Sequence, residues 1–268
     1  MAACLTTAYE TLTLSRPDPH VLLVTLNRPD RANALNTQMG RDLLELFRGL
    51  QLSAAGLRCV ILTGAGERAF CAGGDLRERD GMSDAVWADQ HVIFEQAFYA
   101  LMDCPIPVIA AVNGAAYGGG CEMALACDFI IAAQTARFAL TETSLGIIPG
   151  AGGTQNLPRA LGTRRAKQLI LTAQPFTAPE AADWGMVNEV VAPDALLPRV
   201  FALAARIAAN GPIAVVQAKR AITRGSETDL RTALALEVEA YNRCVPTADR
   251  REGVLAFNEK RPADFRGC

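Results

Sequence analysis

The feature that most constrains this chain is an apolar run that passes straight into a glycine-rich turn and then into a helical pattern. The apolar run covers residues 107–112, the turn contains Gly118, Gly119 and Gly120, and Glu122 falls in the first turn of the helix. Unpaired backbone N–H groups at a helix start can bind developing negative charge. A carboxylate beside them can transfer protons. The stretch is therefore typical of a catalytic site built on a strand, a turn and a helix.

Three loops of the chain share this design. Each follows a short apolar run or strand-like segment, carries glycine and has an acid close by, and they are Cys71–Asp75, Gly118–Glu122 and Glu142–Gly146. Glycine lets a backbone approach a ligand closely because it has no Cβ. Two such loops can direct two N–H groups at one oxygen, and each donor is typically worth roughly 3 kcal/mol of barrier. Glu122 and Glu142 are then available as acid and base.

Each of these features also has a purely structural interpretation. The glycine triplet at 118–120 can serve only to let a helix and a strand pack closely. Glu122 alone can be a favourable charge at a helix start, Glu142 alone a surface carboxylate, and Asp75 a helix cap after Gly74. The residues by themselves therefore indicate acid–base chemistry on an oxyanion-forming substrate, without a metal.

Composition excludes several other classes of protein. The net charge of −2 over 268 residues leaves no basic stripe of the kind that binds nucleic acid. The eight cysteines are scattered without a CxxC pair, and His20 and His91 are not at metal-ligand spacing, so we expect buried free thiols and no metal site. The chain also lacks a phosphate loop, a dinucleotide-binding fingerprint and a nucleophile elbow.

The start of the chain and its apolar runs bear on location. Residues 1–9 have no basic start followed by a long apolar core, and no apolar run reaches the length of a membrane span. We therefore expect no membrane partner. The expected location is the cytoplasm for a bacterial protein and the mitochondrial matrix for a eukaryotic one.

Hydrophobic periodicity divides the chain into a mixed segment and a helical segment. A helix is expected over Gln38–Leu52 with Thr37 as its cap, and another from Ser83 to Met102. Residues 69–76 are expected to form a loop. Strands are expected at Tyr9–Ser15, Val21–Leu26, Cys59–Thr63, Val108–Val112, Phe129–Ala132 and Val187–Val191. Because helical patterns alone follow Pro193, we predict a core over residues 1–192 and a helical region over residues 193–268.

Taken together, the loops resemble the enoyl-CoA hydratase/isomerase (crotonase) superfamily. The matching segments are residues 69–76 (AFCAGGDL), 111–122 (AVNGAAYGGGCE) and 141–155 (TETSLGIIPGAGGTQ), and the resemblance runs from residue 26 to residue 261. It implies an α/β fold in which ββα units wind into a spiral, followed by a C-terminal helical trimerisation region. It also implies a trimer or a dimer of trimers, and an acyl-CoA substrate whose coenzyme A is the only cofactor-like group.

The resemblance assigns roles to four residues of the loops. The backbone N–H groups of Gly74 and Gly119 would hold the thioester oxygen, Glu122 would deprotonate a water, and Glu142 would protonate the alpha carbon. Because this chain has both acids, the implied activity is hydration of an enoyl-CoA. The alternatives are a double-bond isomerase or another crotonase-type reaction, or a non-catalytic homologue that binds acyl-CoA or RNA.

Recognition of the substrate is implied in less detail. The acyl pocket would be built by Leu76 and residues 77–98, where Arg77 and Arg79 either meet a carboxylated acyl chain or are exposed charges. Residues 245–253 look most similar to the methylglutaconyl-CoA hydratase-like branch. Phe257 and Lys260 would reach the coenzyme A of a neighbouring subunit, unless Phe257 packs on its own helix and Lys260 is solvated. The full set expected to bind coenzyme A is Arg28, Ala32, Ala34, Ala72, Asp75, Leu76, Phe257 and Lys260.

Overall fold

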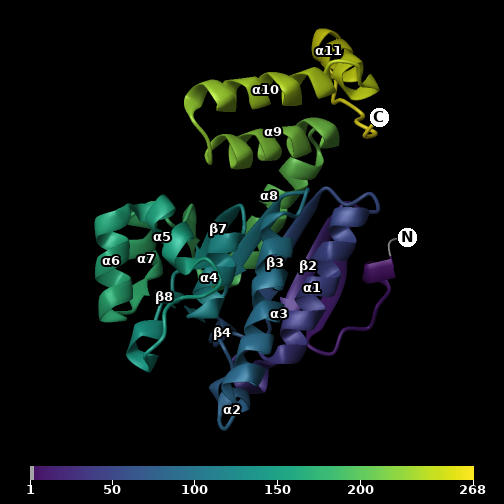
Figure 1. The fold of residues 1–268 in the computed structure, drawn as a ribbon. Coiled ribbons are helices and arrows are strands. Elements are labelled where there is room, and N and C mark those ends of the chain that lie inside the picture. Colours follow the sequence, from purple (N-terminus) through teal and green to yellow (C-terminus); the bar gives the residue numbers. More distant parts are fainter. Residues whose placement is uncertain (1–2) are drawn as a thin grey trace.

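The main sheet of the protein has six strands in a largely parallel arrangement (Figure 1). A computed structural model describes residues 3–268. Strand β2 pairs antiparallel with β1 and parallel with β3, and β5, β7 and β10 continue the parallel order. The strands are β1 (Leu12–Asp18), β2 (Val21–Leu26), β3 (Cys59–Gly64), β5 (Val108–Val112), β7 (Phe129–Ala133) and β10 (Glu189–Val191).

A second sheet of four very short strands runs alongside the first. Its order is β4 (Ala69–Cys71), β6 (Ala115–Tyr117), β8 (Arg137–Ala139) and β9 (Phe176–Thr177). Strands β3, β5 and β7 of the large sheet are each followed along the chain by one strand of the small sheet. This repeated pair of strands confirms the predicted α/β spiral of ββα units. The expectation of a loop over residues 69–76 is wrong at its start, because three-residue strands are too short to show a period-two pattern.

The helices agree closely with the periodicity of the sequence. They are α1 (Thr37–Leu52), α2 (Leu76–Arg79), α3 (Asp84–Met102), α4 (Gly119–Ala126), α5 (Gly153–Leu161), α6 (Thr163–Thr172), α7 (Ala178–Asp183), α8 (Leu196–Ala208), α9 (Pro212–Gly225), α10 (Leu230–Cys244) and α11 (Ala248–Glu259). The cap of α1 is Asn36, whose side chain accepts a hydrogen bond from the Met39 amide at 3.0 Å, so the expected cap, Thr37, is wrong by one residue. Ser83 caps α3 as expected.

No single helix within residues 3–268 is long and apolar enough to cross a membrane. The segments Pro193–Ala208 and Pro212–Gly225 reach that length and composition only as a pair, and they meet at a bend of 105°.

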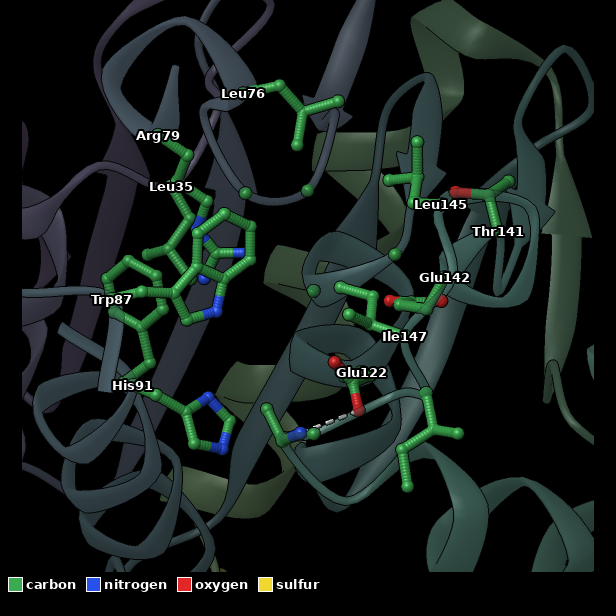
Figure 2. A pocket seen from close by; sticks show the side chains of 18 of the residues that line it. Leu35, Leu76, Arg79, Trp87, His91, Glu122, Thr141, Glu142, Leu145 and Ile147 are labelled. Carbon is green, nitrogen blue, oxygen red and sulfur yellow. Dashed lines mark hydrogen bonds between the residues drawn. The ribbon is translucent and has the colours of Figure 1, made fainter. Parts of the chain in front are cut away.

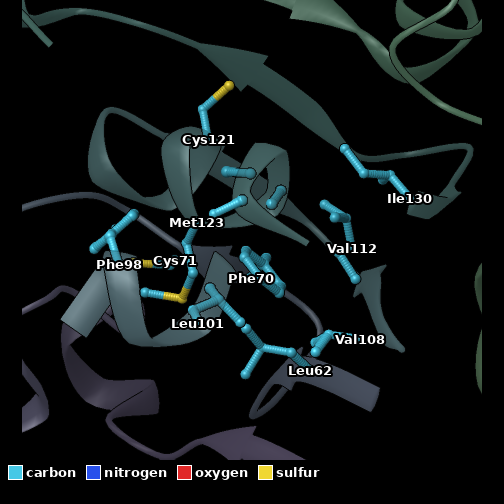
Figure 3. Close-up of a cluster of buried hydrophobic side chains, with 14 of the residues drawn as sticks. Leu62, Phe70, Cys71, Phe98, Leu101, Val108, Val112, Cys121, Met123 and Ile130 are labelled. Carbon is cyan, nitrogen blue, oxygen red and sulfur yellow. The ribbon is translucent and has the colours of Figure 1, made fainter. Parts of the chain in front are cut away.

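The large sheet is covered on both faces, which explains why its strands read as continuous apolar runs. Along β3, Val60 and Leu62 point into the cluster under α1, α3 and α4, whereas Cys59 and Ile61 point into a second cluster. Strand β5 alternates in the same way. Figure 3 shows part of the first cluster, in which Phe70 packs between Leu62, Val112 and the side chains of α3 and α4.

Helix α8 belongs to the sheet core and not to the helical region that follows. Its Val200 and Ala204 are fully buried in the second cluster with Ile61 and Ile109. Helices α9, α10 and α11 instead project away from the sheets (Figure 1). The predicted division at residue 193 thus falls in front of a core helix, and the projecting arm begins at Pro212. The helical pattern could not reveal this difference, because α8 and α9 are both amphipathic.

Two leucines of α1 provide a test of this packing. Leu46 is fully buried, whereas Leu52 is 90% exposed on the same helix. We expect Leu46→Ala to lower the free energy of unfolding by about 3 kcal/mol, because it removes buried methyl groups and leaves a cavity. Leu52→Ala should change it by less than about 0.5 kcal/mol. Urea titrations of both variants measure the difference, and equal effects would contradict the assignment of the core.

Candidate active site

Two glycine-bearing loops meet where β4 and β6 end. These strands pair in parallel, so the segments that follow them, Ala72–Gly74 and Gly118–Gly120, leave the same edge of the small sheet. Gly73 has φ +89°, and a Cβ there would lie 2.7 Å from the Tyr117 carbonyl oxygen. A Cβ on Gly120 would collide with the Cys71 carbonyl oxygen. Only glycine allows the loops to approach this closely.

The close approach leaves two amide groups side by side and unpaired. Hydrogen bonds from Leu35 N to Gly73 O (2.7 Å) and from Asp75 N to Leu35 O (2.9 Å) flank Gly74 but do not use its N–H. Gly119 is the first residue of α4, so its N–H has no partner inside the helix. Neither amide donates to an acceptor within the described part of the chain. The Cβ position of Gly119 lies 3.9 Å from Gly74 N, so one oxygen can accept hydrogen bonds from both amides.

Glu122 is held in the first turn of α4 by the loop that precedes α5. Its Oε1 accepts hydrogen bonds from the amides of Ala151 and Gly153, each at 2.8 Å, and its side chain is almost fully buried (Figure 2). Burial raises the pKa of Glu122 to about 7; the backbone donors oppose the rise and the charge of Glu142 adds to it. A carboxyl group with this pKa can both give and take a proton near neutral pH.

Glu142 begins the 3₁₀ helix Glu142–Leu145 and is also buried. Its Oε2 has no hydrogen-bond partner among the residues that the structure describes. Burial raises the pKa of Glu142, and the positive charge of Arg79 opposes the rise. A buried acceptor without a protein partner is expected to bind a water molecule or a ligand. Glu142 therefore has a buried oxygen that is free to bind a water molecule or a ligand.

Both carboxylates and both glycine loops line one cavity of about 650 Å³. One wall comes from α2 and α3 and the other from the loop after Glu142, so the carboxylates face aromatic and basic side chains across the space (Figure 2). Besides the glycines and the two acids, the principal lining residues are Leu35, Leu76, Arg79, Trp87, His91, Phe94, Leu145, Ile147 and Ile148. The structure thus places Leu76 and part of residues 77–98 on the same cavity as the two acids, and their role in an acyl pocket stays a prediction. Arg79 lines this cavity and Arg77 does not.

Most of the residues expected to bind coenzyme A lie around a neighbouring cavity of about 260 Å³. Ala32, Ala34, Ala72, Asp75 and Leu76 line it, and Ala72, Gly74 and Leu76 also belong to the larger cavity. Arg28 is not among the lining residues; it forms an ion pair with Asp75 at 2.9 Å. Asp75 also caps α2 by accepting from the Arg77 and Glu78 amides, as its structural interpretation requires.

The sequence did not predict the positive lining of the smaller cavity, and Arg77 was expected only to meet the acyl chain or to be an exposed charge. Arg31, Arg68 and Arg77 line this cavity, and they come from three separate segments of the chain. No motif connects them, because only the approach of β4 to the segment after β2 brings them together. The sequence also did not predict that the amides of Ala151 and Gly153 bind Glu122, because this contact joins segments that are far apart in the chain.

The structure does not bring Phe257 and Lys260 to either cavity within one chain. Both lie at the end of α11, in the projecting arm far from α2 (Figure 1). Phe257 is 83% exposed, so it does not pack against its own helix. Contact with a neighbouring subunit's ligand remains a prediction for both residues.

This chain is similar to known proteins in both sequence and structure. A family model described as enoyl-CoA hydratase/isomerase matches residues 18–268. The Bacillus subtilis protein YngF, whose name does not choose between hydratase and isomerase, is 51% identical over 92% of this chain and 95% of its own. The crotonyl-CoA hydratase of Syntrophomonas wolfei is 41% identical over 96% of this chain and 98% of its own. The crystal structure of an enoyl-CoA hydratase from Bacillus anthracis is 45% identical, superimposes with a TM-score of 0.95, and covers 97% of this chain and 100% of its own.

The raised pKa of Glu122 predicts how stability depends on pH. A glutamate in the unfolded chain has a pKa near 4.3, so the native state binds more protons between that value and about 7. This contribution to stability is complete below the unfolded pKa and is lost as the pH rises through the folded pKa. We therefore expect the free energy of unfolding of Glu122→Gln, relative to that of the wild type, to rise by on the order of 2 kcal/mol as the pH is raised from about 5 to about 8.

Urea unfolding across that range measures the effect. Glu10→Gln, at an exposed position, serves as the control. Parallel stability curves for wild type and Glu122→Gln would contradict the prediction.

Proposed function

This chain belongs to the enoyl-CoA hydratase/isomerase family, and we propose that it adds water across the 2,3 double bond of an enoyl-CoA thioester. One observation carries the proposal: Glu122 and Glu142 line the same cavity as the two unpaired amides of Gly74 and Gly119. Addition of water needs a base, an acid and donors for the thioester oxygen. The two side chains and the two amides supply all three, and coenzyme A enters as part of the substrate.

The proposed reaction begins with polarisation of the thioester. Its oxygen accepts hydrogen bonds from the Gly74 and Gly119 amides, and the N-terminal end of α4 adds favourable potential. Electron withdrawal makes C3 of the enoyl group electrophilic. Because these donors are preorganised, they stabilise the enolate-like charge as it forms on the oxygen.

The two carboxylates then divide the proton transfers. Glu122 takes a proton from water as the water oxygen bonds to C3, and protonated Glu142 gives a proton to C2. Glu122 ends protonated and Glu142 ionised, so a proton must return to Glu142 before the next turnover. Repulsion between the two buried carboxylates favours a state in which they share one proton, which this cycle requires.

The neighbouring cavity is the proposed site for the nucleotide end of coenzyme A. Arg31, Arg68 and Arg77 supply positive charge for its phosphates. Ala72, Gly74 and Leu76, which border both cavities, then lie along the path to the thioester. Phe257 and Lys260 of a neighbouring subunit complete this site in the proposed assembly. The name of the Syntrophomonas wolfei relative supports crotonyl-CoA as the first substrate to test.

Substitution of each carboxylate tests the proposed chemistry. We expect Glu122→Gln and Glu142→Gln each to lower kcat on crotonyl-CoA by about 100-fold or more, because a positioned acid or base typically contributes that factor. Loss of the conjugated enoyl absorbance follows the reaction, and Glu10→Gln should retain full rate. Mass analysis of the product distinguishes hydration, which adds one water, from isomerisation, which leaves the mass unchanged. Full activity in either variant would refute the two-carboxylate mechanism.

Self-association is proposed from the exposed face of the arm. Helix α10 and its C-cap residue, Val245, present an apolar stripe at helical spacing. The stripe consists of Leu230, Leu234, Val238, Tyr241 and Val245, all exposed by 40% or more. Exposed apolar stripes of this kind mark protein–protein interfaces. We propose that they join copies of this chain into a trimer or a dimer of trimers.

Substitutions that introduce charge into this apolar stripe test the proposed assembly. We expect Val238→Asp combined with Tyr241→Asp to shift the sedimentation mass to that of a monomer, since burying two unpaired carboxylates costs several kcal/mol. Glu237→Ala, an exposed neighbour, should leave the mass of the assembly unchanged. A monomeric wild type at micromolar concentration would overturn the proposal.

A further inference from the structure

Arg79 lines the cavity, and contacts with neighbouring side chains hold its guanidinium in place. Its Nε donates to Oε1 of Gln90 at 2.8 Å, and Gln90 is itself almost fully buried. Gln90 in turn donates to Thr37 Oγ1 and Glu78 Oε2, both at 2.8 Å. The Arg79 guanidinium also lies 4.3 Å from the centre of the Trp87 ring. These contacts fix the plane of the guanidinium.

The other two nitrogens of the Arg79 guanidinium, Nη1 and Nη2, take no part in these hydrogen bonds. Within residues 3–268, neither Nη1 nor Nη2 has a hydrogen-bond partner, and no carboxylate lies within 4.0 Å of the guanidinium. Glu78 is adjacent, but its Oε2 already accepts from Thr37 N and Gln90. Glu142 stands on the opposite wall of the cavity (Figure 2). The geometry therefore leaves two N–H-bearing nitrogens for a bound molecule.

The position of the guanidinium selects which part of a substrate it can meet. A Cβ built on Gly74 would lie 3.2 Å from Nη1 and 3.3 Å from Cζ of Arg79, so the guanidinium covers the Gly74 backbone inside the cavity. The Gly74 amide is the proposed donor to the thioester oxygen. Atoms a few bonds beyond that oxygen, in the acyl chain, are then within reach of Arg79.

An aliphatic acyl chain suits this position poorly. It would displace water from Nη1 and Nη2 and offer no acceptor in return, which is costly for a charged donor. A carboxylate can accept from both nitrogens at once in the bidentate arrangement typical of arginine. We propose that Arg79 binds a carboxylate on the acyl chain, and that the preferred substrates are short enoyl-CoA thioesters with a carboxylated acyl end. This inference rests on the proposed hydratase function.

Two other roles for Arg79 make different predictions. If Arg79 only clamps α2 to α3, its Nε bond and its stacking on Trp87 suffice, and substitution affects all substrates alike. If its charge acts on the thioester oxygen, substitution again affects all enoyl-CoA substrates alike. Only recognition of the acyl chain makes the effect depend on the presence of a carboxylate.

A matched pair of substrates separates these roles. Glutaconyl-CoA and pent-2-enoyl-CoA share a five-carbon chain and differ in a terminal carboxylate or methyl group. We expect Arg79→Met to reduce the ratio of kcat/KM for glutaconyl-CoA to that for pentenoyl-CoA by about 100-fold. Arg79→Lys, which keeps the charge but not the bidentate geometry, should reduce it by about 10-fold. Equal losses on both substrates, or an unchanged ratio, would overturn the inference.

Arg165→Met is the matched control. Arg165 lies 4.1 Å from the Trp184 ring centre, a stacking contact similar to that of Arg79 on Trp87, but it lines neither of the two cavities of the site. This variant should keep the wild-type ratio. If it altered the ratio as much as Arg79→Met does, the effect would not be specific to the cavity and the inference would fail.

Binding of unreactive analogues tests the inference apart from catalysis. Calorimetry on glutaryl-CoA and pentanoyl-CoA should show tighter binding of glutaryl-CoA to the wild type, and Arg79→Met should abolish the preference. That result supports carboxylate recognition even if the wild type hydrates neither enoyl-CoA, in which case only the proposed function fails. No preference for glutaryl-CoA in the wild type would refute carboxylate recognition while leaving hydration intact.

Discussion

The parallel pairing of β4 with β6 is the constraint on which the rest of the site depends. Both strands have only three residues, yet their pairing sends two glycine loops out from one sheet edge. The loops then pack so tightly that Gly73 and Gly120 admit no Cβ. Their backbones consequently bring the Gly74 and Gly119 amides close together, and α4 starts there. The donors, the helix start and the position of Glu122 all follow from one contact between main chains.

Burial of charge is the second constraint on the site. Glu122 and Glu142 are both buried, and burial raises the pKa of each. The loop before α5 limits the rise in the pKa of Glu122 by directing two amides at one oxygen. One oxygen of Glu142, by contrast, has no hydrogen-bond partner among the described residues. Arg79 adds a positive charge on the facing wall. The cavity thus concentrates charges that destabilise the folded protein, an arrangement characteristic of sites that bind and transform ligands.

The division between core and arm separates two tasks. The core, which includes α8, positions every described residue that lines the two cavities of the site. The arm from α9 to α11 contributes none of them within one chain and instead exposes an apolar stripe. Phe257 and Lys260 lie on this arm, so they can take part in binding only if another copy brings them to a site. In the proposed assembly, substrate binding and oligomerisation are therefore coupled.

The sequence by itself determined the local features of this protein. The helical periodicity of residues 38–52 predicted α1, and the order of the glycine loops identified the family. These features depend on neighbours along the chain. The four short strands, the membership of α8 in the core, the Arg31–Arg68–Arg77 cluster and the orientation of Arg79 were decided only by tertiary structure. Each depends on contacts between segments far apart in sequence, and a strand of three residues or a single arginine carries no periodic signal of its partner.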